Sequence, residues 1–436
     1  MSDADVLILG GGLAGLACRA ALPAHRSATV LEAADEIGGL LRVHERGDYV
    51  FDSVPHVIFF RSRRLLEALR GLLPGGLHAF ARTNSIWQRG RRIPYPYQFN
   101  ARALPDATRD ECLAGFRGNP FAGTGGDGNA TFREWLLGEF GPGFFRHFFQ
   151  PYNEKLYGVP LDGLDAAPLR WTIPSENGRA VLAGEGDPAG APELFYPAGR
   201  EGIALIPRVL AELGRGDVLT GAAAVRVDAG RRTVTVADGR EFRYRSLVSS
   251  IPLPELLGML DGVPEEVREL GRTLAAVPIT VVQVGARATG PALPDIWTYF
   301  PDDDVPFYRM TRLERISAEL APPGGASILL ECAGTAAPDR ESVLAWLDAQ
   351  GVVPRGAVEH YDAWHVPYAY VLFLRGYKRT LQRIRRALAE RGIITTGRYG
   401  GWMYADIEMA MKSGLMAARR LDPSGAPAAA ARIFAA

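Results

Sequence analysis

Six residues near the start of the chain have the spacing of a dinucleotide-binding site. Residues 10–15 read GGGLAG, a G-x-G-x-x-G sequence. Gly10 permits a tight turn, Gly12 lets a pyrophosphate approach the backbone, and Gly15 lets a helix pack closely against a strand. Glu32 lies 22 residues after Gly10, where a carboxylate can bind ribose hydroxyl groups. These residues predict a bound dinucleotide with its phosphates at a helix N-terminus.

Arginine supplies almost all of the positive charge in this chain. Lysines and arginines together number 49, and the lysines are Lys155, Lys378 and Lys412. An arginine guanidinium can bind a phosphate or a carboxylate through two parallel hydrogen bonds. The 49 acidic residues balance the basic ones, so we expect no binding to nucleic acid or to an anionic membrane through overall charge. An anionic ligand must therefore meet a local cluster of arginines.

Other common chemistries find no support in the residue pattern. Cys18, Cys112 and Cys332 are far apart, and their spacing fits neither a disulfide framework nor a zinc site. The chain has no nucleophile elbow and no P-loop lysine, which argues against a hydrolase or a kinase. Its first residues do not resemble a signal peptide, and no run approaches the ~18 apolar residues of a membrane span. We expect a soluble cytoplasmic protein without a bound metal.

The elements that must position the dinucleotide residues form one βαβ unit. Residues 6–9 are a short apolar run typical of a buried parallel strand. Residues 13–22 are rich in alanine and leucine and predict a helix, and residues 28–32 predict a second strand. The glycine turn therefore falls between a strand and a helix, which is the context that the motif requires.

The rest of the chain alternates between helical and strand-like regions. We predict mostly helix over 62–150, strands within 217–250, strands at 278–286 and 326–332, a helix at 376–391, a strand at 392–396 and a helix at 406–421. Two stretches rich in glycine, 115–129 and 175–192, predict mobile loops. One dinucleotide-binding domain assembled from both chain ends, with other domains inserted, fits this pattern.

Residues beyond Glu32 resemble a family of flavoproteins. The segment EAADEIGG, residues 32–39, resembles the continuation of the motif in FAD-binding proteins of the amine oxidase and protoporphyrinogen oxidase superfamily. In that superfamily the double glycine lets a second backbone loop follow the cofactor. Three further segments fall on its motifs: Asp52 with His56, residues 397–401 (GRYGG), and Asp406. The resemblance implies FAD rather than NAD.

Three longer segments resemble UDP-galactopyranose mutases of the eukaryotic type and their bacterial relatives. They are RIPYPYQFN at 92–100, WLLGEFGPGFFRHFFQPYNEKLYGVP at 135–160, and GRYGGWMYADIEMAMKSG at 397–414. The implied fold is α/β, a Rossmann-type FAD-binding domain with a mixed-sheet substrate domain and a helical insertion. We expect the FAD domain to comprise 1–60, 205–255 and 385–422, the mainly helical insertion 61–175, the substrate domain 176–204 and 256–384, and a flexible tail 423–436.

The resemblance also implies roles for individual residues. The expected catalytic residues are His56, Arg309 and Arg170, and the expected substrate-binding residues are Tyr152, Tyr157, Tyr368 and Tyr404. The expected FAD-binding residues are Gly10, Gly12, Leu13, Ala14, Gly15, Glu32, Ala33, Gly38, Gly39, Leu40, Arg42, His56, Val225, Gly397, Arg398, Met403, Tyr404 and Asp406. In those mutases the reduced flavin N5 attacks the sugar of a nucleotide sugar, and arginines and tyrosines retain the leaving diphosphate.

The implied reaction is therefore the interconversion of ring forms of a nucleotide sugar through a reduced-flavin N5–sugar adduct. Two residues depart from the mutase pattern: Val54–Pro55 stands where those enzymes have Gly-Gly, and Tyr157 where they have Trp. The alternative is an FAD-dependent oxidoreductase, an amine or alcohol oxidase or a desaturase, acting on a small biosynthetic intermediate. A non-enzymatic binding protein similar to the GDP-dissociation inhibitors is a third hypothesis, against which Glu32 and the double glycine argue.

Overall fold

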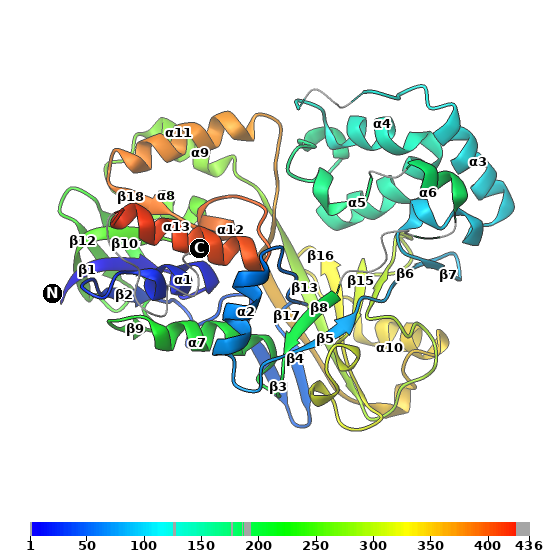
Figure 1. Ribbon diagram of the computed structural model, residues 1–436, viewed down its shortest axis with the longest axis horizontal. Coiled ribbons are helices and arrows are strands. Elements are labelled where there is room, and N and C mark those ends of the chain that lie inside the picture. Colours follow the sequence, from blue (N-terminus) through cyan, green and yellow to red (C-terminus); the bar gives the residue numbers. More distant parts are fainter. Residues whose placement is uncertain (1, 125–127, 176–177, 185, 187–192, 424–436) are drawn as a thin grey trace.

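The structure is a computed structural model that describes residues 2–124, 128–175, 178–184, 186 and 193–423. Two seven-stranded sheets lie side by side, and a group of helices lies above the second sheet (Figure 1). This mixed α/β architecture confirms the predicted fold class. The predicted tail lies outside the described residues, apart from residue 423. None of the described helices is long and apolar enough to cross a membrane.

The first sheet contains the predicted βαβ unit at its centre. Its strands are β1 (Ser2–Leu9), β2 (Ala28–Leu31), β9 (Val218–Leu219), β10 (Ala224–Asp228), β11 (Thr233–Val236), β12 (Glu241–Ser249) and β18 (Ile393–Thr395). The order is β10-β11-β12-β1-β2-β9, with β18 also beside β12, and β1 runs parallel to both β12 and β2. The four apolar residues at the end of β1 are completely buried, as in a parallel strand covered by helices.

The two ends of the chain meet on this sheet. Helix α1 (Leu13–Ala21) packs against α7 (Leu205–Leu213) and against α13 (Ile407–Leu421), the last helix of the described chain. A Cβ atom on Gly414 of α13 would lie only 2.3 Å from the backbone oxygen of Ala14, so only glycine permits this close approach. The segment 397–406, which precedes α13, is thereby held near the glycine turn that follows β1.

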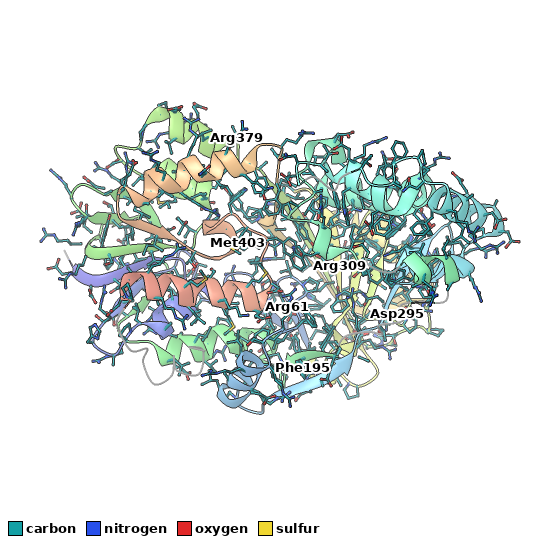
Figure 2. The ribbon with its side chains drawn as sticks, turned by 45° about the horizontal axis from the view of Figure 1, so that its top comes forward. Arg61, Phe195, Asp295, Arg309, Arg379 and Met403 are labelled. Atoms are coloured by element: carbon teal, nitrogen blue, oxygen red, sulfur yellow. The ribbon has the colours of Figure 1, made fainter. Side chains whose placement is uncertain are left out.

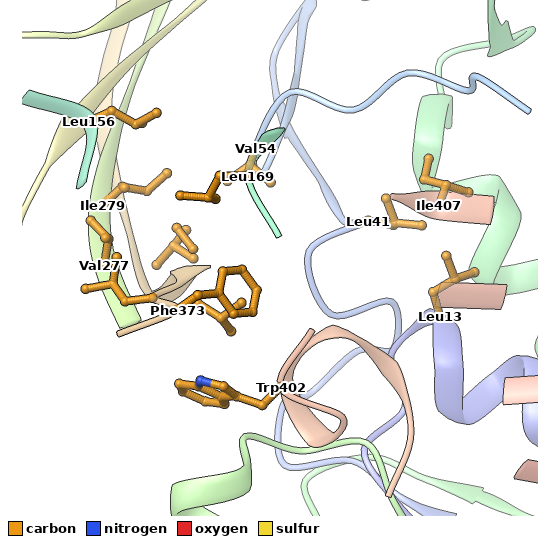
Figure 3. Packing of buried hydrophobic residues seen from close by; sticks show 14 of the residues in the cluster. Leu13, Leu41, Val54, Leu156, Leu169, Val277, Ile279, Phe373, Trp402 and Ile407 are labelled. Carbon is orange, nitrogen blue, oxygen red and sulfur yellow. The ribbon is translucent and has the colours of Figure 1, made fainter. Parts of the chain in front are cut away.

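The second sheet is mixed and mostly antiparallel. Its strands are β6 (Asn84–Gln88), β7 (Arg91–Pro94), β13 (Ala276–Ala286), β14 (Trp297–Tyr299), β15 (Arg309–Arg312), β16 (Ala326–Ala333) and β17 (Val358–Val371), in the order β17-β13-β16-β15-β14-β6-β7. Ile328 and Leu330 pack with α10 (Arg340–Ala349), whereas Leu329 belongs to the large core on the other face. Figure 3 shows part of that large core, where Leu13 and Ile407 beside the first sheet share one cluster with Val277 and Ile279 of the second.

The helical group begins after β7 and is built around aromatic residues. It comprises α3 (Asp106–Arg117), α4 (Phe132–Phe144), a π-helical turn (Phe145–Phe149), α5 (Gln150–Tyr157) and α6 (Gly178–Ala183). Helix α4 begins with a capping box, in which Thr131 accepts from the Glu134 N–H at 3.1 Å and Glu134 accepts from the Thr131 N–H at 2.8 Å. Helix α5 ends at Gly158, which has a φ of +66°. These boundaries fix the position of the tyrosines on α5.

Short elements connect the two sheets. A hairpin of β3 (Val43–Arg46) and β4 (Tyr49–Asp52) is followed by α2 (Arg63–Leu72), and β5 (Leu77–Ala81) pairs with β8 (Glu193–Pro197). The remaining helices are α8 (Leu253–Met259), α9 (Glu265–Arg272), α11 (Tyr377–Ala389) and α12 (Gly397–Gly400). The strands predicted within 217–250, at 278–286, 326–332 and 392–396, and the helices predicted at 376–391 and 406–421, are confirmed.

The prediction of mostly helix over 62–150 is wrong for residues 77–94, which form β5, β6 and β7. The expected insertion at 61–175 is therefore mainly helical only beyond β7, and two of its strands belong to the second sheet. The hairpin between β6 and β7 turns at Arg89 and Gly90, both with positive φ, and lacks the Asn-Gly or Asp-Gly pair that identifies such turns in a sequence. The other strand that pairs with β6 is β14, which lies more than 200 residues further along the chain.

The two predicted mobile loops are described only in part. Residues 115–117 belong to α3, and residues 178–183 of the second stretch form α6, where a loop was expected. Residues 125–127, 176–177, 185 and 187–192 lie outside the described residues. The mobility of these stretches stays a prediction.

Candidate active site

The glycine turn between β1 and α1 has the geometry that its sequence predicts. Gly10 has a φ of +96°, and a Cβ on it would lie 2.5 Å from the Ser250 hydroxyl oxygen. A Cβ on Gly15 would lie 2.1 Å from the backbone oxygen of Gly10. Both positions therefore require glycine for the packing of the strand, turn and helix.

A second glycine loop faces the first across a narrow space. Gly38 donates its N–H to the Gly11 carbonyl at 2.9 Å, and both Gly38 and Gly39 have positive φ. A Cβ on Gly12 would meet only the Cα of Gly39, at 3.9 Å. The two loops thus leave backbone exposed along a cradle that side chains would fill, which fits a cofactor with a pyrophosphate in its middle.

Glu32 is held at the end of β2 by backbone amides. Its carboxylate accepts hydrogen bonds from the N–H of Gly11 at 2.7 Å and from that of Ala34 at 2.9 Å, and it retains further lone pairs for ribose hydroxyls. Ala33, the next residue, also lies just after the end of β2. Val225 lies on β10, three residues after Ala222, whose N–H donates to the Glu32 carbonyl. Val225 is 51% exposed. Val225 could therefore contribute only backbone to an adenosine site.

The returning segment lies against α1 and leads into α13. Gly397 has a φ of +78°, and a Cβ there would lie 2.8 Å from the Ala14 side chain. The Met403 N–H donates to the Arg398 carbonyl at 2.9 Å, which closes the turn around Met403 (Figure 2). Asp406 caps α13 through the Met409 N–H at 2.8 Å and pairs with Arg61 at 2.9 Å, and its expected contact with the cofactor stays a prediction.

Arg42 lies over the second glycine loop. Its Nε donates to the Gly39 carbonyl at 2.8 Å, and its guanidinium carbon lies 5.5 Å from the centre of the Trp364 ring. Leu40, which precedes it, is half-buried, and Leu13 is 8% exposed. These residues border the cradle on the side of the hairpin β3–β4.

His56 follows β4 in a loop that buried hydrogen bonds fix in place. Asp52 is completely buried, accepts from the Tyr196 hydroxyl at 2.7 Å and from the His56 N–H at 3.4 Å, and burial raises its pKa to about 7. His56 Nδ1 lies 3.0 Å from the Val54 carbonyl, which can only accept, so Nδ1 carries the proton and Nε2 is an acceptor. Burial, together with the charges of Arg398 and Arg309, lowers the pKa of His56 to about 4. His56 is therefore neutral near pH 7.

Arg309 is held by a buried carboxylate on the neighbouring strand. Arg309 of β15 and Glu331 of β16 are paired residues in the antiparallel register, and two guanidinium nitrogens contact the two carboxylate oxygens, Nη2 and Oε1 at 2.7 Å. Glu331 is 1% exposed and also accepts from the Tyr308 hydroxyl at 3.1 Å. The Tyr370 hydroxyl lies 3.5 Å from Nη2 of Arg309. Burial opposes the charge of Arg309, but Glu331, Tyr370 and Tyr308 together raise the pKa of Arg309 well above its usual value.

Arg398 lies among three tyrosine rings and keeps two buried donors available. Its guanidinium carbon is 4.9 Å from the ring centre of Tyr404, 5.6 Å from that of Tyr370 and 6.0 Å from that of Tyr399. Its Nε and Nη2 atoms are buried and find no acceptor among the described residues. Buried donors of this kind are usually satisfied, so these two N–H groups point to a bound ligand that accepts hydrogen bonds.

The structure brings most of the predicted tyrosines to this cluster. Tyr157 packs edge-on against Tyr370 at 6.3 Å, and Tyr152 packs edge-on against Tyr299 at 5.6 Å. Burial raises the pKa of Tyr152 well above its usual value, and the nearby charge of Arg309 offsets only part of this increase. Tyr404 contacts Arg398 on one side and Trp171 on the other, at 4.6 Å.

Two predicted residues lie at the edge of the cluster. Tyr368 hydrogen-bonds to Glu255 of α8 and is 6.3 Å from Tyr399. Its place beside Arg309 is taken by Tyr370, two residues further along β17 and on the same face of the strand. Arg170 is half-buried in a short 3₁₀ turn (Arg170–Thr172) next to Trp171.

Sequence reasoning missed several residues that complete the site. They are Tyr308, Glu331 and Tyr370 around Arg309, and Arg82, Tyr95 and Tyr299 beyond Tyr152. The guanidinium carbon of Arg82 lies 5.1 Å from the ring centre of Tyr95, and Tyr95 packs against Tyr299 at 5.2 Å. Side chains alternate along a strand, so Tyr370 lies on the same face as Tyr368, but no strand was predicted over 358–371. Polar and aromatic side chains thus form a series of neighbours that leads from His56 through Arg309 and Tyr299 to Arg82.

Comparison with known proteins agrees with this geometry. Residues 13–422 match the family of flavin-containing amine oxidoreductases. The chain belongs to this family. Family membership implies a flavin cofactor, and the two glycine loops and Glu32 fit FAD. The chain is therefore a flavoenzyme of the amine oxidase superfamily, and the predicted membership of that superfamily is confirmed.

Solved structures show the fold. A reduced UDP-galactopyranose mutase superposes with a TM-score of 0.88 at 22% identity, covering 99% of this chain and 97% of the other. A putative protoporphyrinogen oxidase from Exiguobacterium sp. 255-15 gives 0.75 at 15% identity, covering 97% and 99%. The cyclohexylamine oxidase of Brevibacterium oxydans IH-35A gives 0.66 at 17% identity, covering 96% and 98%. The fold is thus similar to that of a mutase and of oxidases.

Proposed function

We propose that this protein interconverts ring forms of a nucleotide sugar and uses reduced FAD to do so. The observation that carries the proposal is the pair of buried, unsatisfied N–H groups of Arg398 near Arg309 and neutral His56. Such donors are suited to a diphosphate, whose oxygens accept charge-assisted hydrogen bonds. A role in the eukaryotic-type branch of the mutases belongs to the same proposal.

The balance of charge around His56 supports an anionic substrate. Arg309 and Arg398 are positive, Glu331 is negative and already paired, and His56 is neutral, so these four groups together have a positive charge. Arg82 adds a further cation beyond Tyr299. A protonated amine would be repelled here, which disfavours a typical amine oxidase substrate.

Some residues of the cluster could hold the leaving diphosphate, and others position the side chains that do so. The Arg398 guanidinium lies against the rings of Tyr404 and Tyr370, and these three side chains could retain a diphosphate after its bond to the sugar breaks. Glu331 fixes the plane of the Arg309 guanidinium through its two-point contact. The unprotonated Nε2 of His56 could accept a proton from a hydroxyl group beside the flavin.

The cofactor would be held by the two glycine loops, Glu32, Arg42 and the 397–404 segment. Reduced FAD would supply a nucleophilic nitrogen to the anomeric carbon of the sugar. Pro55 restricts the loop before His56, because proline fixes φ and lacks an N–H. We therefore infer that this loop keeps one conformation in both redox states of the flavin.

An FAD-dependent oxidoreductase is the second candidate, and Val54–Pro55 is the observation that favours it. The mutases that this chain resembles have a flexible pair of glycines at that place. An oxidase or desaturase with this site would act on an anionic or neutral small molecule, because of the arginines around His56.

Anaerobic turnover separates the two candidates. Purified, FAD-loaded protein is incubated with a panel of nucleotide sugars, with and without dithionite, and the products are separated by anion exchange. A new isomer that forms only with reduced flavin supports the mutase. Bleaching of oxidised flavin by a compound of the panel, with no isomer, would contradict it in favour of the oxidoreductase.

A further inference from the structure

A second pocket lies behind the turn that contains Met403. It has a volume of about 350 Å³ and opens between α11, residues 167–171 and the 402–404 turn. The residues that line it include the aromatic Trp171, Tyr377, Trp402 and Tyr404. Two cations, Lys378 and Arg385, also line it. The glycine loops, Glu32 and His56 do not line it, whereas Met403 and Tyr404 of the 397–404 segment do, so the pocket adjoins the candidate active site. Its size falls within the range of small-molecule sites.

The cations of this pocket are poorly neutralised. Arg385 donates to the Gly401 carbonyl at 2.7 Å, and no carboxylate of the described residues forms an ion pair with it. Burial lowers the pKa of Arg385, and the charge of Arg420 lowers it further. Lys378 lies 3.7 Å from Asp165, which is the one acidic group of the described chain in contact with it. The pocket therefore contains more positive than negative charge.

Other arginines on the same helix are paired. Arg383 contacts Glu266 of α9, and Arg386 contacts Glu390 at 3.1 Å, one turn along the helix. Arg379 of the same helix is exposed and does not line the pocket (Figure 2). Arg385, which lines the pocket, thus lacks the acidic partner that Arg383 and Arg386 have among the described residues, as expected of an anion site.

The aromatic walls offer flat surfaces to a ring. Trp171 is 46% exposed, although tryptophan is usually well covered, and its ring meets that of Tyr404 edge-on at 4.6 Å. Trp402 is 1% exposed and has a φ of +47°, a conformation that large side chains rarely adopt. Trp402 lines the pocket, and strained backbone of this kind is concentrated at binding sites.

We propose that this pocket binds a small organic anion with a planar ring, whose anionic group pairs with Arg385 and Lys378 while its ring packs against Trp171 and Tyr377. The anionic group is a carboxylate or a phosphate, since guanidinium and ammonium groups bind both. Tyr404 lines this pocket and also contacts Arg398 of the candidate active site. A bound anion would thus be coupled to the active site through one shared side chain.

Isothermal titration of the FAD-loaded protein tests the proposal. The probes are 2-naphthoate, phenyl phosphate, the neutral 2-naphthamide and inorganic phosphate. We expect one of the two ring anions to bind at least tenfold more tightly than 2-naphthamide and than inorganic phosphate, and that probe identifies the anionic group. Equal binding of the neutral and charged rings, or no binding of either ring anion, would overturn the proposal.

Variants locate the bound probe. Arg385→Gln and Lys378→Gln should each weaken binding at least tenfold, and Lys378→Gln keeps the test valid if Arg385→Gln disturbs the Gly401 turn. Arg386→Gln removes a paired arginine from the same helix and should leave the affinity unchanged. Arg309→Ala should also leave it unchanged. Loss of binding in Arg309→Ala, or unchanged binding in both pocket variants, would place the probe in the candidate active site and contradict the inference.

Discussion

At the scale of residues, the contact between Arg309 and Glu331 determines what the site can bind. Glu331 is nearly completely buried, so it must be paired, and Nη2 of Arg309, which contacts Glu331, also lies 3.5 Å from the Tyr370 hydroxyl. The sequence predicts Arg309 as a site residue, but Glu331 lies within the apolar run SILLECA and carries no recognisable motif. Only the register of β15 against β16 pairs the two.

Breaking this pair should destabilise the protein. We expect Glu331→Gln to lower the free energy of unfolding by roughly 2 kcal/mol or more, because it leaves the charge of Arg309 without its partner. Arg309→Ala in the Glu331→Gln background should cost much less than in the wild type. Urea unfolding of the two single variants and the double variant measures this coupling. Additive effects would contradict a direct interaction.

Asp52 should make stability depend on pH. Burial raises its pKa from 3.8 to about 7, so it stabilises the folded state at low pH, and this contribution decreases as pH rises from about 4 through 7. Asp52→Asn stays neutral and can still accept from Tyr196. Its free energy of unfolding, relative to wild type, should therefore increase by roughly 1 kcal/mol or more between pH 5 and pH 8.

The matched control is Asp48→Asn, which removes an exposed carboxylate from the same hairpin. Urea midpoints at pH 5 and pH 8 give the comparison for both variants. If the difference between Asp52→Asn and wild type is the same at both pH values, Asp52 does not titrate as its buried position predicts.

At the scale of elements, the β1–α1–β2 unit could be predicted because its motif is local. Its glycines are spaced within six residues, Gly15 packs against the Gly10 carbonyl, and the helix begins where the turn ends. The strands β5–β7 could not be predicted, since their partners β8 and β14 come from distant segments and the β6–β7 turn uses Arg89 and Gly90. Tyr370 was missed because no strand was predicted over 358–371, where β17 places Tyr368 and Tyr370 on one face.

The two glycines of the turn should behave differently when alanine replaces them. Gly12→Ala has open space for its methyl group, so we expect a normally folded protein with at least tenfold weaker FAD binding. Gly15→Ala collides with the Gly10 carbonyl at 2.1 Å, so we expect a lower melting temperature even without FAD. Thermal unfolding of the apoproteins and flavin titration separate the effects. Full flavin occupancy in Gly12→Ala would contradict the position of the cradle.

At the scale of the whole molecule, the candidate active site is assembled from distant parts of the chain. Arg309 and Tyr370 belong to the second sheet, Arg398 precedes the last helix, and Tyr157 ends a helix of the insertion. The resemblance to flavoenzymes predicted most of these residues, since their motifs recur in order along the sequence. The contacts among them follow from the packing of two sheets and a helical group, which no local pattern contains.

The central claim is that Arg309 and Arg398 hold the diphosphate of a nucleotide sugar, and a binding measurement tests it most directly. FAD-loaded protein is titrated with UDP, dTDP, GDP and ADP, and binding is followed through the flavin absorbance and by calorimetry. We predict that at least one of them binds, and that Arg309→Ala weakens it at least tenfold while flavin occupancy stays complete. Arg272→Ala, at an exposed arginine, should have no effect. If no nucleoside diphosphate binds, or if Arg309→Ala binds as tightly as wild type, the account is contradicted.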